Sequence, residues 1–300
     1  MKILVFAILC LVWGFTWQAI KVSLEGLPPN ISAGVRFTLA FVALFLYTLW
    51  RRVPLRISRR EFQILTVTAL LVYTLDYGLI YWGEQYINAG VAAIFFATFP
   101  LFTAIFTNFL FRHEHFRADR FIGLVIGFLG IVLVFYDQLV RTQFSLGVLL
   151  GSLAVIIGAA SAALSLVIVK KYLPSLSPLT LTFHQLWIGG LSLLCIGMCF
   201  EDMSSIHLTP RIVSAVLYLG VAGSALAFVL WYWLLQKTST ITVSLIIYIT
   251  PLVALIGDYL FFREIIPLRS FIGMVVVFIG IGYTQKNLRA FPRVFRKAKV

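Results

Sequence analysis

Ten long apolar stretches make up most of this 300-residue chain and limit what it can fold into. A helix needs roughly 20 apolar residues to cross about 30 Å of bilayer hydrocarbon. The stretches lie at residues 2–21, 30–50, 62–83, 87–111, 118–136, 146–169, 178–200, 211–235, 240–262 and 268–285. Hydrophobic residues form 61% of the chain and charged residues only 12%, about half the charged share of a soluble domain. The sequence therefore predicts an all-α polytopic membrane protein with ten transmembrane helices.

The distribution of Lys and Arg predicts the orientation of these helices. If the N-terminus is cytoplasmic, the cytoplasmic joints and the C-terminal tail hold 18 Lys and Arg residues, and the opposite side holds five. Cytoplasmic loops carry such an excess of positive charge. We therefore expect an integral protein of the cytoplasmic (inner) cell membrane with both termini in the cytoplasm. This bias and the basic tail at 286–300 account for the net charge of +13, so no nucleic-acid partner is expected.

The two halves of the chain repeat each other at a spacing of 149 to 151 residues. The matched residues include Lys21 and Lys170, Tyr81-Trp82 and Tyr232-Trp233, Pro100 and Pro251, and Phe121-Ile122-Gly123 and Phe271-Ile272-Gly273. Residues 1–137 and 146–285 are thus predicted to be two copies of a five-helix unit. Because five is odd, the second copy enters the membrane from the opposite side. Such inverted repeats are found in many transporters, with the binding site between the two copies.

Two segments resemble a known family. The opening LVWGFTWQAIKVSLEGLPPNISAGVRFTLA is similar to the first two helices of EamA-type transporters of the drug/metabolite transporter superfamily. The closing ITPLVALIGDYLFFREIIPLRSFIGMVVVFIGI resembles the recurring Pro, Glu and Gly-rich helix of that family. The resemblance implies ten helices, a central cavity between the halves, and export of small metabolites such as amino acids. Where Gly-Glu is common in the family, this chain has Arg112-His113-Glu114 and Arg263-Glu264.

Asp76 and Arg36 are charged residues deep inside predicted spans. At about 1.5 Å of rise per residue, both lie about 9 Å below the non-cytoplasmic surface of a core about 30 Å thick. The two side chains are therefore predicted as an ion pair. A charged group in hydrocarbon is costly, so it is a functional candidate by default. Asp76 would contact a substrate ammonium group or carry a coupling proton; the alternatives are a fixed structural pair and a position in a wet vestibule.

Aromatic residues are predicted to form most of the cavity wall. The predicted substrate-cavity residues are Trp13, Trp17, Tyr73, Asp76, Tyr77, Tyr81, His184 and Tyr248. Such a wall suits an apolar side chain or an organic cation held over ring faces, whereas packing in the core or against lipid is the alternative for each ring. His184 would act as a titratable gate, and the alternative is a neutral histidine bonded to a neighbouring helix.

Two prolines and several missing motifs complete the prediction. Pro100 and Pro251 fall inside predicted spans, where each removes a backbone hydrogen bond, and we expect them to act as hinges or as static kinks. The sequence contains no Gly-rich phosphate loop, paired-His metal motif or nucleophile elbow. We therefore expect no catalytic residue, no metal and no cofactor.

Three functions follow as hypotheses. The first is a monomeric secondary active transporter that exports amino acids or related amphipathic solutes by alternating access. The second is a permease for organic cations such as quaternary amines, or for nucleotide-like solutes; a cation would depend on Asp76 and an anion on Lys21, Arg36 or Lys170-Lys171. The third, a membrane enzyme or sensor, would need a polar cluster that the spans do not supply. The expected partners are a small-molecule substrate and the lipid bilayer, with protons as a candidate coupling ion.

Overall fold

The computed structural model describes residues 1–111, 118–262 and 267–286, and every regular element in these ranges is helical. In chain order the elements are α1 (Lys2–Gly14), α2 (Thr16–Leu24), α3 (Pro29–Arg51), α4 (Arg59–Ala69), η1 (Leu70–Asp76), α5 (Tyr77–Gly83), α6 (Ala89–Phe96), α7 (Phe99–Leu110), α8 (Ala118–Val134), α9 (Tyr136–Arg141), α10 (Leu146–Tyr172), α11 (Pro178–Phe200), η2 (Met203–Ser205), α12 (Pro210–Gly220), η3 (Val221–Leu226), α13 (Ala227–Lys237), α14 (Thr240–Ser244), α15 (Ile246–Phe262) and α16 (Leu268–Lys286). Arg112-His113-Glu114, Arg263-Glu264 and, beyond Lys286, the basic tail lie outside the described residues.

Eight helical segments among the described residues are long and apolar enough to cross a membrane. They are Lys2–Leu24, Pro29–Arg51, Arg59–Gly83, Ala89–Leu110, Leu146–Tyr172, Pro178–Phe200, Pro210–Lys237 and Leu268–Gln285. The two other predicted stretches hold shorter helices: α8 has 17 residues, and α14 is separated from α15 at Leu245. The all-helical class is therefore confirmed, and the count of ten spans stays a prediction.

Two of these eight spans are broken in the middle. Phe15 separates α1 from α2, and Ala97 and Thr98 separate α6 from α7. Pro100 therefore lies in the first turn of α7, where a missing N–H costs no helical hydrogen bond, and it does not interrupt a continuous helix as expected. Pro251 does lie inside α15.

Two spans contain a π-helical segment at matching positions in the two halves. In the first half η1 joins α4 to α5, and in the second half η3 joins α12 to α13. The first residues of η1 and η3, Leu70 and Val221, are 151 positions apart. A π-helical turn inside an α-helix is rare and often marks a functional position.

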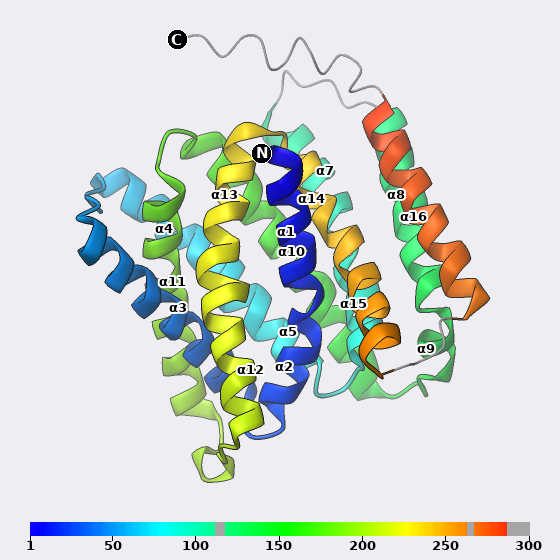
Figure 1. Ribbon diagram of the computed structural model, residues 1–300, viewed down its shortest axis with the longest axis horizontal. Coiled ribbons are helices and arrows are strands. Elements are labelled where there is room, and N and C mark those ends of the chain that lie inside the picture. Colours follow the sequence, from blue (N-terminus) through cyan, green and yellow to red (C-terminus); the bar gives the residue numbers. More distant parts are fainter. Residues whose placement is uncertain (112–117, 263–266, 287–300) are drawn as a thin grey trace.

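The helices form a bundle in which spans from the two halves pack against each other (Figure 1). At one edge α8 packs along α16, and at the other α3 packs along α11. Between them, α10 contacts η1 and helices α4 to α7, while α1 contacts α13 and α15. The α8–α16 contact is close because glycines from both helices face each other, among them Gly127 and Gly280.

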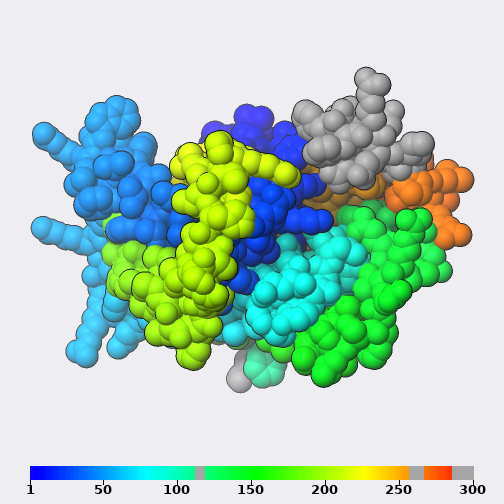
Figure 2. Space-filling view, turned by 90° about the horizontal axis from the view of Figure 1, so that it is seen from below, coloured from blue at the N-terminus to red at the C-terminus, as the bar shows by residue number. Residues whose placement is uncertain are grey.

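The connecting segments gather at two ends of the bundle. At the end that we call the lysine end, Nζ of Lys2 donates to the Lys237 carbonyl at 3.1 Å, and Nζ of Lys171 donates to the Leu110 carbonyl at 2.8 Å. At the opposite end, which we call the glutamate end, Glu25 pairs with Arg211. Figure 2 looks onto the glutamate end, where segments from both halves of the chain lie next to each other.

Candidate functional site

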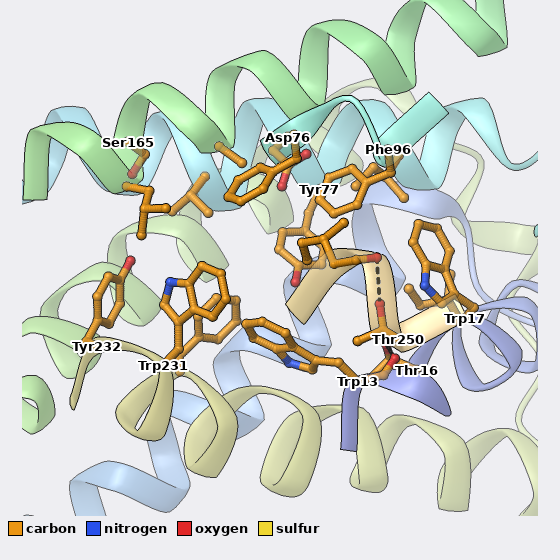
Figure 3. Close-up of a pocket in the computed structure, with 18 residues that line it drawn as sticks. Trp13, Thr16, Trp17, Asp76, Tyr77, Phe96, Ser165, Trp231, Tyr232 and Thr250 are labelled. Carbon is orange, nitrogen blue, oxygen red and sulfur yellow. Dashed lines mark hydrogen bonds between the residues drawn. The ribbon is translucent and has the colours of Figure 1, made fainter. Parts of the chain in front are cut away.

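A pocket in the middle of the bundle, which we call the central pocket, is built from both halves of the chain. It is lined by Trp13, Thr16, Trp17, Ile20, Val72, Asp76, Tyr77, Ile80, Phe96, Phe99, Ala162, Ser165, Leu166, Phe228, Trp231, Tyr232, Ile247 and Thr250 (Figure 3). Its free volume is about 80 Å³, enough for a few water molecules but less than the roughly 300 Å³ of a typical small-ligand site. The walls must therefore move apart before a solute of metabolite size fits.

Aromatic rings form the walls of the central pocket. The Trp13 ring lies 4.9 Å from the Trp231 ring and 5.5 Å from the Phe228 ring, measured between centroids. The indole Nε1 of Trp13 donates a hydrogen bond to the Gly223 carbonyl in η3 at 3.0 Å. This bond fixes the Trp13 ring against the second half of the chain. Such a wall offers ring faces to an apolar group or to a cation.

Asp76 is the only charged side chain among the residues that line the central pocket, all of which the structure describes. It ends the π-helical segment η1 and is 1% exposed. Its Oδ1 atom is buried and has no hydrogen-bond partner. Gly158 of α10 leaves room for this carboxylate, because a Cβ there would lie 2.8 Å from Oδ1. In Figure 3 Asp76 lies on the side of the pocket opposite Trp13 and Trp231.

The expected ion pair between Arg36 and Asp76 does not form in this conformation. Arg36 is 1% exposed, and its Nε donates to Ser224 Oγ at 2.8 Å. Its two NH groups donate to the Tyr81 hydroxyl at 3.4 Å and to the Gly223 carbonyl at 3.3 Å. No salt bridge in the described part of the chain joins Arg36 to Asp76. The prediction rested on depth in the membrane, which does not tell which way a side chain points around its helix.

Four of the predicted cavity residues, namely Trp13, Trp17, Asp76 and Tyr77, line the central pocket. Tyr73 and Tyr81 lie behind that wall. The Tyr73 ring packs 4.9 Å from Phe228, and Tyr81 accepts the hydrogen bond from Arg36. The guanidinium carbon of Arg36 lies 4.8 Å from the centroid of the Tyr77 ring, so Tyr77 separates this buried cation from the pocket.

His184 and Tyr248 lie elsewhere in the bundle. Trp187 Nε1 donates to His184 Nδ1 at 3.3 Å, so His184 Nε2 is the donor to the Leu55 carbonyl at 2.9 Å. This is the arrangement of a neutral histidine that fastens a loop to a helix, which was the alternative to a gate. The Tyr248 hydroxyl donates to the Leu124 carbonyl at 2.8 Å, and its ring packs on Gly127 in α8. Neither residue lines the central pocket.

Much of the second-half lining was missed from the sequence. Phe228, Trp231 and Tyr232 come from α13, and Thr250 comes from α15. The sequence repeat could have indicated these residues. Tyr81-Trp82 matches Tyr232-Trp233, so α13 occupies the position in the second half that α5 occupies in the first. As for metals, the described residues contain no group of three or more His, Cys, Asp or Glu side chains that could hold an ion.

Comparison with known proteins gives the family. The model of the EamA-like transporter family matches residues 1–136 and 149–284. The uncharacterized transporter YoaV of Bacillus subtilis (strain 168) is 26% identical over 90% of this chain and 92% of its own length. The uncharacterized transporter YvbV of the same organism is 29% identical over 96% of this chain and 92% of its own length. Protein PagO of Salmonella typhimurium is 27% identical over 97% of this chain and 95% of its own length.

A solved crystal structure shares the fold. It superimposes with a TM-score of 0.79 at 16% sequence identity and covers 96% of this chain and 98% of that chain. Together with the apolar helices, the family match over nearly the whole sequence identifies an integral membrane protein. The chain belongs to the EamA-like transporter family.

Proposed function

We propose that the protein is a secondary active transporter that moves small amphipathic metabolites across the cytoplasmic membrane by alternating access. In this proposal residues 1–137 and 146–285 are two five-helix repeats of opposite topology, with ten spans in all. The substrate binds in the central pocket, and the pocket opens to one face of the membrane at a time. Pro100 and Pro251 remain candidate hinges.

The observation that carries this proposal is the composition of the central pocket wall. Fourteen of the 18 lining residues form seven pairs that are 149 or 151 positions apart. Examples are Tyr77 with Phe228, and Thr16 with Ser165. A wall made of equivalent positions from two copies supports a site at the interface of two repeats, as in secondary transporters.

The positions of two loops support opposite topology. The loop after α2 lies at the glutamate end, where the Gly26 carbonyl accepts a hydrogen bond from the His207 amide at 3.0 Å. The loop after α10 lies at the lysine end, where Gln236 Nε2 donates to the Leu176 carbonyl at 2.6 Å. These are the loops that follow the first and sixth predicted spans. The sequence predicts that the excess of Lys and Arg lies on the cytoplasmic side, and the described residues Lys2, Lys171 and Lys237 lie at the lysine end. We therefore propose that this end faces the cytoplasm.

The substrate that the pocket supports best carries a positively charged amino group. Asp76 supplies a buried carboxylate with an unpartnered oxygen, and the rings supply apolar faces that also attract cations. Amino acids and related amphipathic solutes, exported from the cell, satisfy this requirement. The same carboxylate is the candidate carrier of a coupling proton.

One observation favours the alternative substrate class, organic cations. No Lys, Arg or His is among the lining residues, all of which are described, so the pocket offers no cation to a substrate carboxylate. The same absence weighs against nucleotide-like solutes, because a phosphate group needs positive charge or several N–H donors. Amines without a carboxylate are therefore the second candidate.

Flux into proteoliposomes tests the proposal. Purified protein is reconstituted and supplied with labelled amino acids, simple amines and a quaternary ammonium compound, with and without a pH gradient. We expect saturable flux of at least one amine-bearing solute and its loss in Asp76→Asn. The control Asp202→Asn, which changes an exposed carboxylate that does not line the pocket, should transport normally. Flux that persists in Asp76→Asn with unchanged pH dependence would remove Asp76 from the mechanism, and no flux of any solute would reject this substrate class.

A further inference from the structure

Lys21 and Lys170 occupy equivalent places at the two ends of the central pocket. Lys170 lies four residues, about one helical turn, beyond the lining residue Leu166 towards the lysine end. Lys21 lies four residues beyond Trp17 towards the glutamate end. The two lysines are 149 positions apart, the spacing at which the two halves repeat.

At the lysine end, Lys170 is held by two hydrogen bonds. Lys170 Nζ donates to the carbonyl oxygens of Leu235 at 2.7 Å and Thr238 at 2.9 Å. These carbonyls belong to the last turn of α13 and the residues after it, where helical partners are lacking. Lys170 thus ties α10 to the end of α13, one turn beyond the lining residues Leu166 and Trp231.

At the glutamate end the matching contact is not made. The position that corresponds to Leu235 is Glu84, 151 residues earlier and four residues beyond the lining residue Ile80. Glu84 as a residue is partly exposed, but its Oε1 atom is inaccessible and has no hydrogen-bond partner. Lys21 is close enough to act on this carboxylate electrostatically, yet no salt bridge joins the two within the described ranges.

We propose that Lys21 and Glu84 form an ion pair that closes the central pocket at the glutamate end in the other state of the transport cycle. This inference rests on the proposed alternating access. In the present conformation the lysine end is tied by Lys170 and the Lys21–Glu84 pair is apart. In the other state of the transport cycle, the Lys170 hydrogen bonds are broken and the Lys21–Glu84 ion pair is formed.

The charge of Glu84 links this gate to pH. Burial raises the pKa of the Glu84 carboxyl to about 8, and the positive charges of Lys21 on α2 and Arg36 on α3 oppose that rise. Tyr81 in α5, three residues before Glu84, is a further titratable neighbour. The carboxyl is therefore mostly neutral in slightly acidic solution and charged in alkaline solution. Because only the charged form pairs with Lys21, a rise in pH favours closure at the glutamate end. When the pair forms, the proton of the Glu84 carboxyl is released to water.

Cysteine labelling tests the gate without any substrate. Cys10, Cys195 and Cys199 are replaced by Ala, and Ile20→Cys supplies a reporter in the pocket wall next to Lys21. A membrane-impermeant maleimide is applied from the face that labels Met203→Cys, an exposed position at the glutamate end. Each of Glu84→Gln and Lys21→Gln should speed labelling of the reporter about threefold to tenfold, as expected for loss of one partly buried ion pair.

The double variant and a matched control decide the outcome. The pair Lys21→Gln with Glu84→Gln should label no faster than the faster single variant, because both changes remove one interaction. Exchanging the two charges, Lys21→Glu with Glu84→Lys, should restore slow labelling. Glu25→Gln, which removes another carboxylate at the same end, should leave the rate unchanged. Unchanged rates in both single variants, or fully additive effects in the double variant, would overturn the proposal.

A second measurement keeps the proposal testable if the variants fold poorly. With the intact Lys21–Glu84 pair, labelling of Ile20→Cys is compared at about pH 6 and about pH 9, on either side of the Glu84 pKa. The rates are divided by those of Met203→Cys to remove the intrinsic pH dependence of thiol labelling. We expect slower relative labelling at the higher pH, and an equal or faster rate would overturn the gate. If labelling shows the expected pH dependence but proteoliposomes transport none of the tested solutes, the proposed substrate class is rejected and the Lys21–Glu84 gate is not.

Discussion

Tyr77 and Phe228 lie 6.3 Å apart between ring centroids in the wall of the central pocket, and they are 151 positions apart in the chain. The first belongs to α5 and the second to α13, the helices that follow the two π-helical segments. The two rings differ by one hydroxyl group, whereas other equivalent pairs differ more, such as Ile80 and Trp231. The chain thus retains a repeated framework around a pocket whose two sides are chemically different.

The carboxylate of Asp76 should be required for transport but not for stability. An unpaired buried charge disfavours the folded state, so Asp76→Asn is expected to keep or slightly raise the unfolding temperature while flux falls to the background of empty liposomes. Thermal unfolding in detergent and proteoliposome flux measure the two effects. A variant that loses both flux and stability would show that Asp76 has a structural role instead.

Arg36 should be a major contributor to stability. Arg36→Ala leaves Ser224 and Tyr81 without their buried partner, and we expect a loss of about 1–3 kcal/mol in the free energy of unfolding. Arg36→Gln should lose less, because glutamine already forms the equivalent contact between Gln185 and Tyr232. Both are measured by denaturant unfolding in detergent.

Arg211→Ala is the control for Arg36. Its guanidinium forms a salt bridge with Glu25 at 3.5 Å, and the two side chains are 70% and 48% exposed. An exposed pair of this kind contributes roughly 0–1 kcal/mol. Equal destabilisation by Arg211→Ala and Arg36→Ala would contradict the importance of the buried contacts.

The glycines between α8 and α16 should not tolerate a methyl group. A Cβ on Gly280 would collide with the backbone of Gly127, whereas a Cβ on Gly282, two residues later on α16, meets nothing within 4 Å. Gly280→Ala is therefore expected to destabilise the protein by about 1–3 kcal/mol through overpacking. Gly282→Ala should instead be neutral or slightly stabilising, since alanine favours the helix. A similar unfolding temperature for the two variants would contradict the close α8–α16 contact.

The indole of Trp13 should matter more for transport than a tryptophan on the outer surface. Trp13→Phe removes the hydrogen bond to the Gly223 carbonyl and shortens one wall of the pocket. We expect flux to fall by about tenfold, the effect of losing roughly 1.4 kcal/mol of interaction. Trp50, which is 75% exposed on α3, supplies the control Trp50→Phe, for which normal flux is expected. Equal flux in both variants would place Trp13 outside the transport site.

The membrane class and most spans could be predicted because hydrophobicity over roughly 20 residues is a strong and simple pattern. Asp76 and Trp13 could be found for a related reason, since a carboxylate or an indole stands out in an apolar segment. By contrast, His184 and Tyr248 were predicted to line the cavity but do not line the central pocket, because the direction in which each side chain faces depends on packing against neighbouring helices. The π-helical segments η1 (LLVYTLD) and η3 (VAGSAL) share no residue pattern that would indicate a changed helical turn in both.

Other features needed the three-dimensional arrangement. The break at Leu245 occurs without Pro or Gly, so no residue type marks it. The proposed role of Glu84 depends on its nearness to Lys21, 63 positions earlier in the chain. The repeat spacing relates the predicted cavity residues Tyr77 and Tyr81 to Phe228 and Tyr232, but only the structure shows that Tyr232 lines the pocket whereas Tyr81 does not.

Accessibility of two single cysteines tests most directly whether the halves have opposite topology. Glu25→Cys follows the first predicted span and Ser175→Cys follows the sixth, and both positions are exposed. In a background without Cys10, Cys195 and Cys199, an impermeant thiol reagent is applied to one face of the membrane and then to the other. The account predicts that Glu25→Cys is labelled only from the outside and Ser175→Cys only from the cytoplasmic side. Labelling of both from the same face would contradict the inverted repeat and the alternating access built on it.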